Sequence, residues 1–221
     1  MTIYKNQREL LREKRKADKR RSVSISVLII VGVIVIFGSI TLLSRFLAKP
    51  VDYETSQGFM VGDPNAPVEV VAFSNYSCGY CKIFSETIEK DFISDFAETG
   101  KVNYRYVNLA SSNESSINAA EASYCATEQN KFFEYKDYLY TYAAAADGFT
   151  LENLNKYAKS AGLDTESFEI CMIEGDYDQA YLNDRAYAQS AGINATPTFL
   201  VNGQIVSASE LVTTVEELLG N

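Results

Sequence analysis

Residues 68–92 read VEVVAFSNYSCGYCKIFSETIEKDF and predict a strand, a turn and a helix in direct succession. The first six positions are rich in β-branched and aromatic residues, which is typical of a buried strand. Apolar residues then recur at helical spacing, at Ile83, Phe84, Ile88 and Phe92. Cys78 and Cys81 therefore lie where the strand ends and the first turn of the helix begins.

Two cysteines on the first turn of a helix suit reversible redox chemistry. The unpaired N–H groups and the positive dipole end of a helix favour a thiolate, which is the reactive form of cysteine. Cys78 and Cys81 are spaced to close a small disulfide at that point. The strand–turn–helix context thus favours a redox role for this pair.

Half of a zinc site is the main alternative for the two cysteines. A structural zinc ion needs about four ligands, usually cysteine or histidine. The chain has no histidine, and its other cysteines, Cys125 and Cys171, stand alone. The sequence therefore disfavours zinc and indicates no metal or other cofactor. The lack of histidine also excludes Ser–His and Cys–His nucleophile schemes.

The N-terminal segment predicts where the protein resides. Residues 1–21 form a basic tail with nine Lys or Arg against three acidic residues, a local net charge of +6. Residues 22–44 carry no charged side chain and are dominated by Val, Ile and Leu. As a helix they would span about 34 Å, enough for the core of a bilayer. Because basic flanks stay in the cytoplasm, we expect a single-pass anchor in the cell membrane with an extracytoplasmic domain after it.

A cleaved signal peptide is the alternative for this segment. The apolar region of a signal peptide is normally about 7–15 residues long and ends at small residues. The apolar run here is longer, and Phe46 stands where a small residue would precede cleavage after Ala48. The sequence therefore favours an uncleaved anchor.

The rest of the chain is acidic and long enough for one domain. The total net charge of −9 leaves −15 on residues 22–221, which argues against nucleic acid as a partner. Residues 45–60 indicate a short stalk, and residues 61–221 suffice for one domain with its own core. Four cysteines in an exported domain suit an oxidising compartment.

Periodicity outlines the elements of this domain. The helix after Cys81 should end near Gly100, and the alternating residues 101–109 predict a second strand that runs parallel to the first. Helical patterns without a strand-like run fill about residues 112–191, which indicates a helical insertion.

A strand pair and a helix should complete the domain. Residues 196–201 predict a strand, and Asn202-Gly203 is a strong signal for a hairpin turn into a returning strand. We expect Ser207 or Ser209 to cap a last helix.

Three segments carry a resemblance to a known family. They are GDPNAP at 62–67, VVAFSNYSCGYCK at 70–82 and GINATPTF at 192–199. In their order, with the helical stretch between the last two, the chain resembles the DsbA-like thiol:disulfide oxidoreductases over about residues 62–219. The resemblance implies an α/β thioredoxin fold with a helical insertion, preceded here by one transmembrane helix.

The resemblance also assigns roles to individual residues. It implies that Cys78 is the exposed nucleophile, that Cys81 is the buried resolving thiol, and that Pro197 is a cis proline facing the pair. A substrate strand would then bind beside Thr196 and Pro197. An ordinary turn before an edge strand is the alternative for this dipeptide.

Two positions depart from the family pattern. The family often has a buried acidic residue six positions before the first cysteine, where this chain has Ala72. The dipeptide between the cysteines is Gly79-Tyr80, without the histidine that stabilises the thiolate in strongly oxidising relatives. Both changes bear on the redox potential and leave the disulfide chemistry itself in place.

Cys125 and Cys171 both fall in the helical insertion. Relatives with cysteines at similar places imply a structural disulfide, which would close a loop of 46 residues and stabilise the fold by roughly 3–4 kcal/mol. Two separately buried thiols that pack as small apolar groups are the alternative.

These features predict an enzyme, a thiol:disulfide oxidoreductase that forms disulfides in exported, cysteine-containing proteins. A membrane partner that reoxidises it and passes electrons to quinone is implied by the resemblance. One alternative is a reductase of the same fold, and another is a non-catalytic, chaperone-like binding module.

Overall fold

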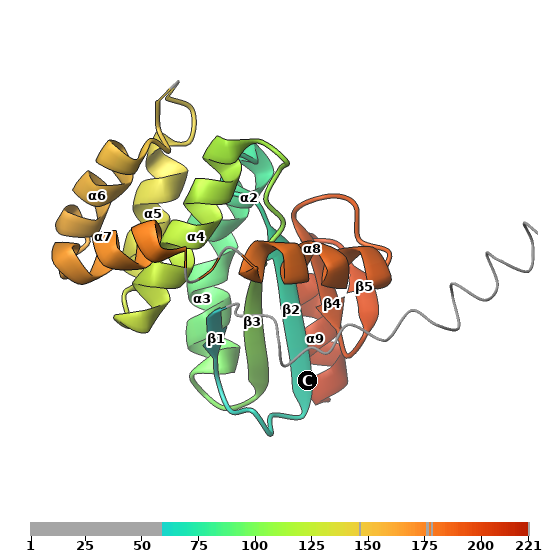
Figure 1. The fold of residues 1–221 in the computed structure, drawn as a ribbon. Coiled ribbons are helices and arrows are strands. Elements are labelled where there is room, and N and C mark those ends of the chain that lie inside the picture. The colour runs from blue at the N-terminus through green and yellow to red at the C-terminus, as the bar shows by residue number, and fades with distance from the viewer. Residues whose placement is uncertain (1–58, 146, 176, 178, 221) are drawn as a thin grey trace, which may run out of the picture. The chain divides into compact units, whose positions relative to one another are not determined.

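The computed structural model describes residues 59–145, 147–175, 177 and 179–220 (Figure 1). The predicted basic tail (1–21), transmembrane anchor (22–44) and most of the stalk (45–60) lie outside the described residues. Within the described part of the chain, no helix has the length and apolar character needed to cross a membrane.

A mixed sheet forms the centre of the described domain, with the strand order β1-β3-β2-β4-β5. Its strands are β1 (Phe59–Val61), β2 (Val68–Ser74), β3 (Val102–Asn108), β4 (Thr198–Val201) and β5 (Gln204–Val206). The pair β2–β3 is parallel, and β1–β3, β2–β4 and β4–β5 are antiparallel. The predicted strand–helix–strand unit and the C-terminal hairpin are both present.

Strand β1 corrects the predicted boundary between stalk and domain. Phe59 and Met60 were expected in the stalk, but they pair with Tyr106 and Arg105 of β3. The Phe59 ring also stacks on Phe132 with a centroid distance of 4.3 Å. A strand of three residues is too short for alternation to reveal, and partners distant in sequence stabilise it.

The helical stretch after Cys78 is continuous but not uniformly α-helical. It runs through α2 (Gly79–Phe84), η2 (Ser85–Glu89), α3 (Lys90–Phe92) and η3 (Ile93–Ala97), where η2 and η3 are π-helical turns. Gly100 follows with φ of 74°, a left-handed conformation that glycine adopts without strain. The predicted end of the helix is therefore confirmed, whereas its π-helical turns were not predicted.

Helices make up the insertion between β3 and β4, as the sequence predicts. They are α4 (Glu114–Glu128), α5 (Phe132–Tyr142), α6 (Leu151–Ser160), α7 (Thr165–Glu174) and α8 (Ala180–Ser190). The side chains of Asn113, Thr150 and Asp164 accept hydrogen bonds from backbone N–H groups at the starts of α4, α6 and α7.

The C-terminal end of the domain follows the prediction except at one helix cap. Asn202 and Gly203 have φ of 48° and 82°, as a type I′ hairpin turn requires. Helix α9 (Leu211–Leu219) begins after Glu210, which provides no side-chain cap. The prediction that Ser207 or Ser209 caps this helix is therefore wrong. The Ser207 hydroxyl donates instead to the Glu210 carboxylate at 2.5 Å.

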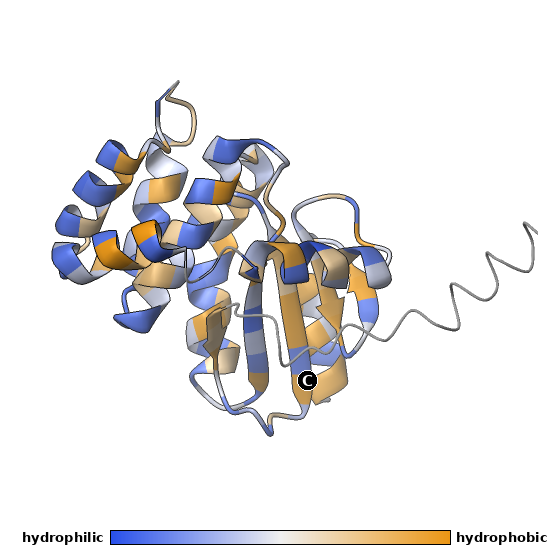
Figure 2. Cartoon of the chain, viewed as in Figure 1, coloured by the Kyte–Doolittle hydropathy of each residue, from blue (hydrophilic) through white to orange (hydrophobic). Residues whose placement is uncertain are grey.

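The central strand β2 is buried on both faces of the sheet, and Figure 2 shows its apolar character. Val68, Val70 and Ala72 belong to the main core, which also contains Cys81. Val71 and Phe73 pack on the opposite side with Tyr187 and Ala188 of α8. Strand alternation separates the two sets, so both layers of the fold depend on β2.

One ion pair is buried inside the main core. Lys136 of α5 and Glu89 of η2 are each 1% exposed and form a direct salt bridge. The Lys136 ammonium group also donates to Ser85 Oγ at 2.8 Å, and the Tyr104 hydroxyl donates to Glu89 Oε1 at 2.7 Å. These bonds compensate two charges that have lost their water, and they join the helical stretch after Cys78, called the active-site helix below, to β3 and to the insertion.

A disulfide joins Cys125 of α4 to Cys171 of α7, with a Cα–Cα distance of 6.0 Å. It links two helices of the insertion and shares no residue with the Cys78–Cys81 turn. The disulfide implied by the family resemblance is therefore present, and the alternative of two separately buried thiols is wrong.

We expect Lys136→Met to lower the free energy of unfolding by about 3–5 kcal/mol, because it leaves the Glu89 carboxylate buried without its cation. Adding Glu89→Gln should restore most of that loss, since the glutamine amide is neutral and its oxygen still accepts from Tyr104. Urea denaturation measures both.

The matched control for this prediction is Lys90→Met. Lys90 and Asp137 connect the same helical stretch to α5 at 2.9 Å, but their side chains are 63% and 45% exposed. Its loss should cost less than about 1 kcal/mol. Equal losses for the Lys90 and Lys136 variants would contradict the assignment.

Replacing both Cys125 and Cys171 with alanine should lower stability by about 3–4 kcal/mol, because the disulfide restricts a loop of 46 residues in the unfolded chain. Urea denaturation without reductant tests this. The wild-type protein with this disulfide reduced should unfold at nearly the same urea concentration as the variant. Unchanged stability in the variant would rule out a stabilising role.

Candidate active site

Cys78 occupies the N-cap position of α2, immediately before the first helical residue. Its backbone N–H donates to the Asn75 carbonyl at 3.0 Å, and its own carbonyl accepts from the Lys82 N–H at 3.1 Å. The nucleophile predicted from the sequence therefore lies at the positive end of the helix dipole.

Asn75 organises the turn that presents Cys78, a role that sequence reasoning did not assign. Its Oδ1 accepts from the Ser77 N–H at 2.8 Å, which is a typical Asx turn. Its Nδ2 donates to the Leu109 carbonyl at 2.8 Å and so ties the turn to the loop after β3. The sequence signal that could have predicted this turn is an asparagine at the end of a strand, three residues before the cysteine.

The two thiols differ sharply in burial. Cys81 has no exposed surface, whereas Cys78 is half-buried, and both are in the free thiol form in this structure. The accessible sulfur is thus the one nearer the helix end. This arrangement places the two residues as the sequence predicts, with one thiol outside and one inside.

Residues far apart in the sequence complete the site. The Thr196–Pro197 peptide bond is cis and directly precedes β4. Because β4 pairs with β2 in antiparallel register, Thr196 is brought beside the cysteine turn. The Cys78 thiol donates to the Thr196 carbonyl oxygen at 3.3 Å across 118 residues of sequence.

The surroundings of Cys78 favour its thiolate. Partial burial raises the pKa of the thiol, but hydrogen bonds from the Thr196 side chain, the Cys81 N–H and thiol, and the Tyr80 N–H together lower it by more. The net pKa is below the usual cysteine value. The Thr196 carbonyl binds the protonated thiol, whereas the Thr196 side chain favours the thiolate, so one residue contacts both states.

Cys81 has the opposite character. Burial raises its pKa to about 11, against smaller lowering contributions from the Thr196 and Ser74 side chains and the Asn75 backbone. Cys78 raises it further. The pair therefore combines an accessible thiol whose ionisation is favoured with a buried thiol that stays protonated at neutral pH.

Ala72 leaves an apolar position beneath this pair, as the sequence indicates. It is 1% exposed and belongs to the same core cluster as Cys81. The active-site helix contributes a buried charge further along, at Glu89, which forms a salt bridge with Lys136 of α5. The Glu89–Lys136 ion pair was not predicted from the sequence, because no local pattern shows that either side chain points inward.

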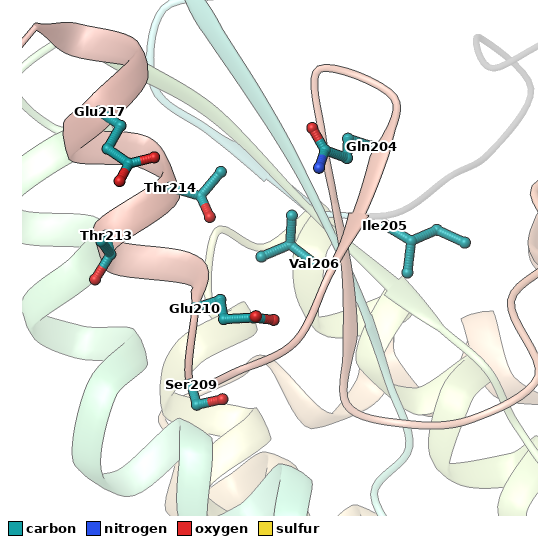
Figure 3. Close-up of a pocket in the computed structure, with 8 residues that line it drawn as sticks. All are labelled: Gln204, Ile205, Val206, Ser209, Glu210, Thr213, Thr214 and Glu217. Atoms are coloured by element: carbon teal, nitrogen blue, oxygen red, sulfur yellow. The ribbon is translucent and has the colours of Figure 1, made fainter.

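The recess between β5 and α9, shown in Figure 3, is separate from this chemistry. It has a volume of about 360 Å³ and is lined by residues such as Ile205, Glu210 and Glu217. Neither Cys78 nor Cys81 contributes to its wall. In the described part of the chain, no group of three or more His, Cys, Asp or Glu is placed to hold a metal ion.

Fold and site together define the class of protein. The strand–turn–helix carries Cys78, whose pKa is lowered, and the buried Cys81, and the loop with the cis Thr196–Pro197 bond lies beside them. This arrangement is a thioredoxin-fold dithiol centre. Such a centre exchanges disulfides with other thiols.

Comparison with known proteins agrees with this class. The family described as Thioredoxin matches residues 54–221, and the chain belongs to that family. Disulfide bond formation protein D of Bacillus subtilis is 30% identical over 161 residues, which are 66% of this chain and 68% of that protein. The chain is therefore a DsbA-like thiol–disulfide oxidoreductase.

Solved structures share the fold. The oxidised form of BdbD from Bacillus subtilis superposes with a TM-score of 0.66 at 26% identity, covering 75% of this chain and 94% of BdbD. DsbA from Chlamydia trachomatis gives a TM-score of 0.65 at 22% identity, covering 73% and 91% of the two chains.

Larger proteins also contain a similar segment. Na(+)/H(+) antiporter NhaA 1 of Mycobacterium sp. (strain KMS) is 31% identical over 160 residues, which are 72% of this chain. This chain spans about a quarter of the length of that antiporter, 25%.

We expect alkylation of Cys78 by iodoacetamide to persist at pH values where an ordinary cysteine no longer reacts, because its pKa is lowered. Thr196→Val should slow the reaction several-fold at pH 7, since it removes a side chain that favours the thiolate. The pH–rate profile of the reduced protein measures both effects.

Thr198→Val provides the matched control, since its hydroxyl donates to the Ala195 carbonyl at 2.8 Å. The Thr198→Val variant should show the same pH–rate profile of Cys78 alkylation as the wild-type protein. The same shift in both variants would show that loop structure, rather than the Thr196 hydroxyl, controls the thiol.

Proposed function

We propose that this protein forms disulfides in exported proteins by exchange through Cys78 and Cys81. The observation that carries the proposal is the opposite perturbation of the two thiols, with a lowered pKa at Cys78 and a raised pKa at Cys81. A stabilised Cys78 thiolate favours the reduced form of the couple, and a couple with a stabilised reduced form is a strong oxidant.

The reaction proceeds in two exchange steps. A substrate thiolate attacks the Cys78 sulfur of the oxidised protein, the Cys78–Cys81 bond breaks, and Cys81 leaves as a thiolate that takes up a proton. A second substrate thiolate then attacks the substrate sulfur of the mixed disulfide, and Cys78 leaves as a thiolate. The substrate loses two electrons to form its disulfide, and the protein gains them as a dithiol.

The two perturbed pKa values act at different steps of this exchange. Cys78 leaves readily because its thiolate is favoured. Cys81, with a pKa of about 11, is the poorer leaving group, but once released it takes up a proton, and the resulting thiol does not attack the mixed disulfide. In this mechanism Thr196 and Pro197 bind the substrate strand beside Cys78.

The proposal also includes a location and a partner. Residues 22–44 anchor the chain in the cell membrane, and the catalytic domain faces the extracytoplasmic side. The Cys125–Cys171 disulfide suits that oxidising compartment. Each turnover leaves the protein as a dithiol, so a membrane partner must reoxidise it, and a quinone-linked protein supplies an electron acceptor there.

A redox titration of the full-length protein in detergent against glutathione tests the direction of exchange. We expect a potential nearer about −120 mV, typical of strong oxidants, than about −270 mV, typical of reductants. The variant with Cys125 and Cys171 replaced by alanine isolates the Cys78–Cys81 couple. A potential near about −270 mV would instead indicate a reductase.

Replacing Cys78 with serine should abolish oxidation of a dithiol peptide, because no other described thiol is accessible. Formation of the peptide disulfide, followed by mass spectrometry, measures this. Undiminished activity of the Cys78→Ser variant in assisting folding would instead favour a chaperone-like module.

A further inference from the structure

A recess opens beside Cys78 on the side of the sheet that carries α8. It has a volume of about 350 Å³ and lies between the loop after β3, helix α8 and the loop before Pro197. Asn75 and Thr196 form part of its wall. These two residues also contact the cysteine turn, so the recess adjoins the reactive sulfur.

The lining of the recess combines apolar side chains with polar ones. Side chains of Asn75, Ser111, Ser112, Gln189 and Asn194 contribute amides and hydroxyls. Among the described residues that line it, one is charged, the arginine at position 185. The single positive charge in this lining therefore favours an anionic ligand group.

Arg185 is held in a defined position. It is half-buried on α8, and one guanidinium N–H donates to Ser112 Oγ at 3.0 Å. A guanidinium group carries five N–H donors in a planar fork that matches a carboxylate. The bond to Ser112 uses one donor and orients the others.

Substrate chemistry connects this recess to the thiol. When a substrate cysteine is bonded to Cys78, the neighbouring residues of the substrate are only about 3.8 Å away per residue along its chain. The side chain next to the cysteine therefore lies within reach of the recess. Its interaction with Arg185 is local, whereas the acidic net charge of the protein is screened beyond about 8 Å at physiological salt.

We propose that this recess is a specificity subsite in which Arg185 binds the carboxylate of a substrate residue adjacent to the reactive cysteine. The inference rests on the proposed function, because it names a substrate class for the same site. Segments with Asp or Glu beside a cysteine are thus the preferred substrates.

Capture of single-cysteine peptides by the full-length Cys81→Ser variant in detergent tests this subsite. The probes carry glutamate, glutamine or lysine on both sides of a cysteine that is linked to thionitrobenzoate. The Cys78 thiolate attacks the peptide sulfur, a Cys78–peptide disulfide forms, and coloured thionitrobenzoate leaves with the electron pair. Rates with glutathione under the same conditions correct for the intrinsic reactivity of each peptide.

We expect the corrected rate for the glutamate peptide to exceed that for the lysine peptide about tenfold, as one charge-assisted contact allows. In the Cys81→Ser background, Arg185→Gln should remove this preference, and Arg185→Glu should reverse it. Lys156→Gln removes the same charge from an exposed pair on α6 and should leave the preference unchanged.

Equal corrected rates for the three peptides would overturn the inference. So would an Arg185→Gln variant that slows all three equally and also slows iodoacetamide alkylation of Cys78, because Arg185 would then only support the loop. Unchanged alkylation in that variant, together with a lost preference, supports the subsite. The capture assay does not depend on the redox potential, so a reductase-like potential would refute the proposed function alone.

Discussion

The buried Glu89–Lys136 salt bridge holds three parts of the domain together. It joins the active-site helix to α5 of the insertion, and the Tyr104 hydroxyl adds β3 to the same group. Two charges without water are tolerated in a core only when each is fully bonded, which restricts how these three elements can pack. The helix that carries Cys78 is thereby held in one position relative to the sheet and the insertion.

The chemistry of the site arises from this fixed helix and from the pairing of β2 with β4. The helix end favours the Cys78 thiolate, and the core around Cys81 disfavours its ionisation. Strand pairing brings Thr196 against Cys78 from the far end of the chain. Neither thiol would have its character in isolation, because one depends on donors from the loops and the other on burial.

The two departures from the family pattern have different structural consequences. Ala72 makes its position in the core apolar, and a buried carboxylate lies instead on the active-site helix, at Glu89. Tyr80, in place of histidine, is 76% exposed and contributes a backbone N–H that lowers the pKa of Cys78. Stabilisation of the thiolate thus rests on hydrogen bonds and the helix end rather than on a neighbouring cation.

The strand–turn–helix around Cys78 and Cys81, the helical insertion and the C-terminal hairpin could be predicted from the sequence, because periodicity and turn residues are local signals. The place of β1 in the sheet, the pairing of Cys125 with Cys171 and the two charged side chains in the core became evident from the three-dimensional structure. The recess beside Arg185 likewise forms from loops that are distant in sequence. Such features depend on which segments meet, and no local pattern records long-range contact.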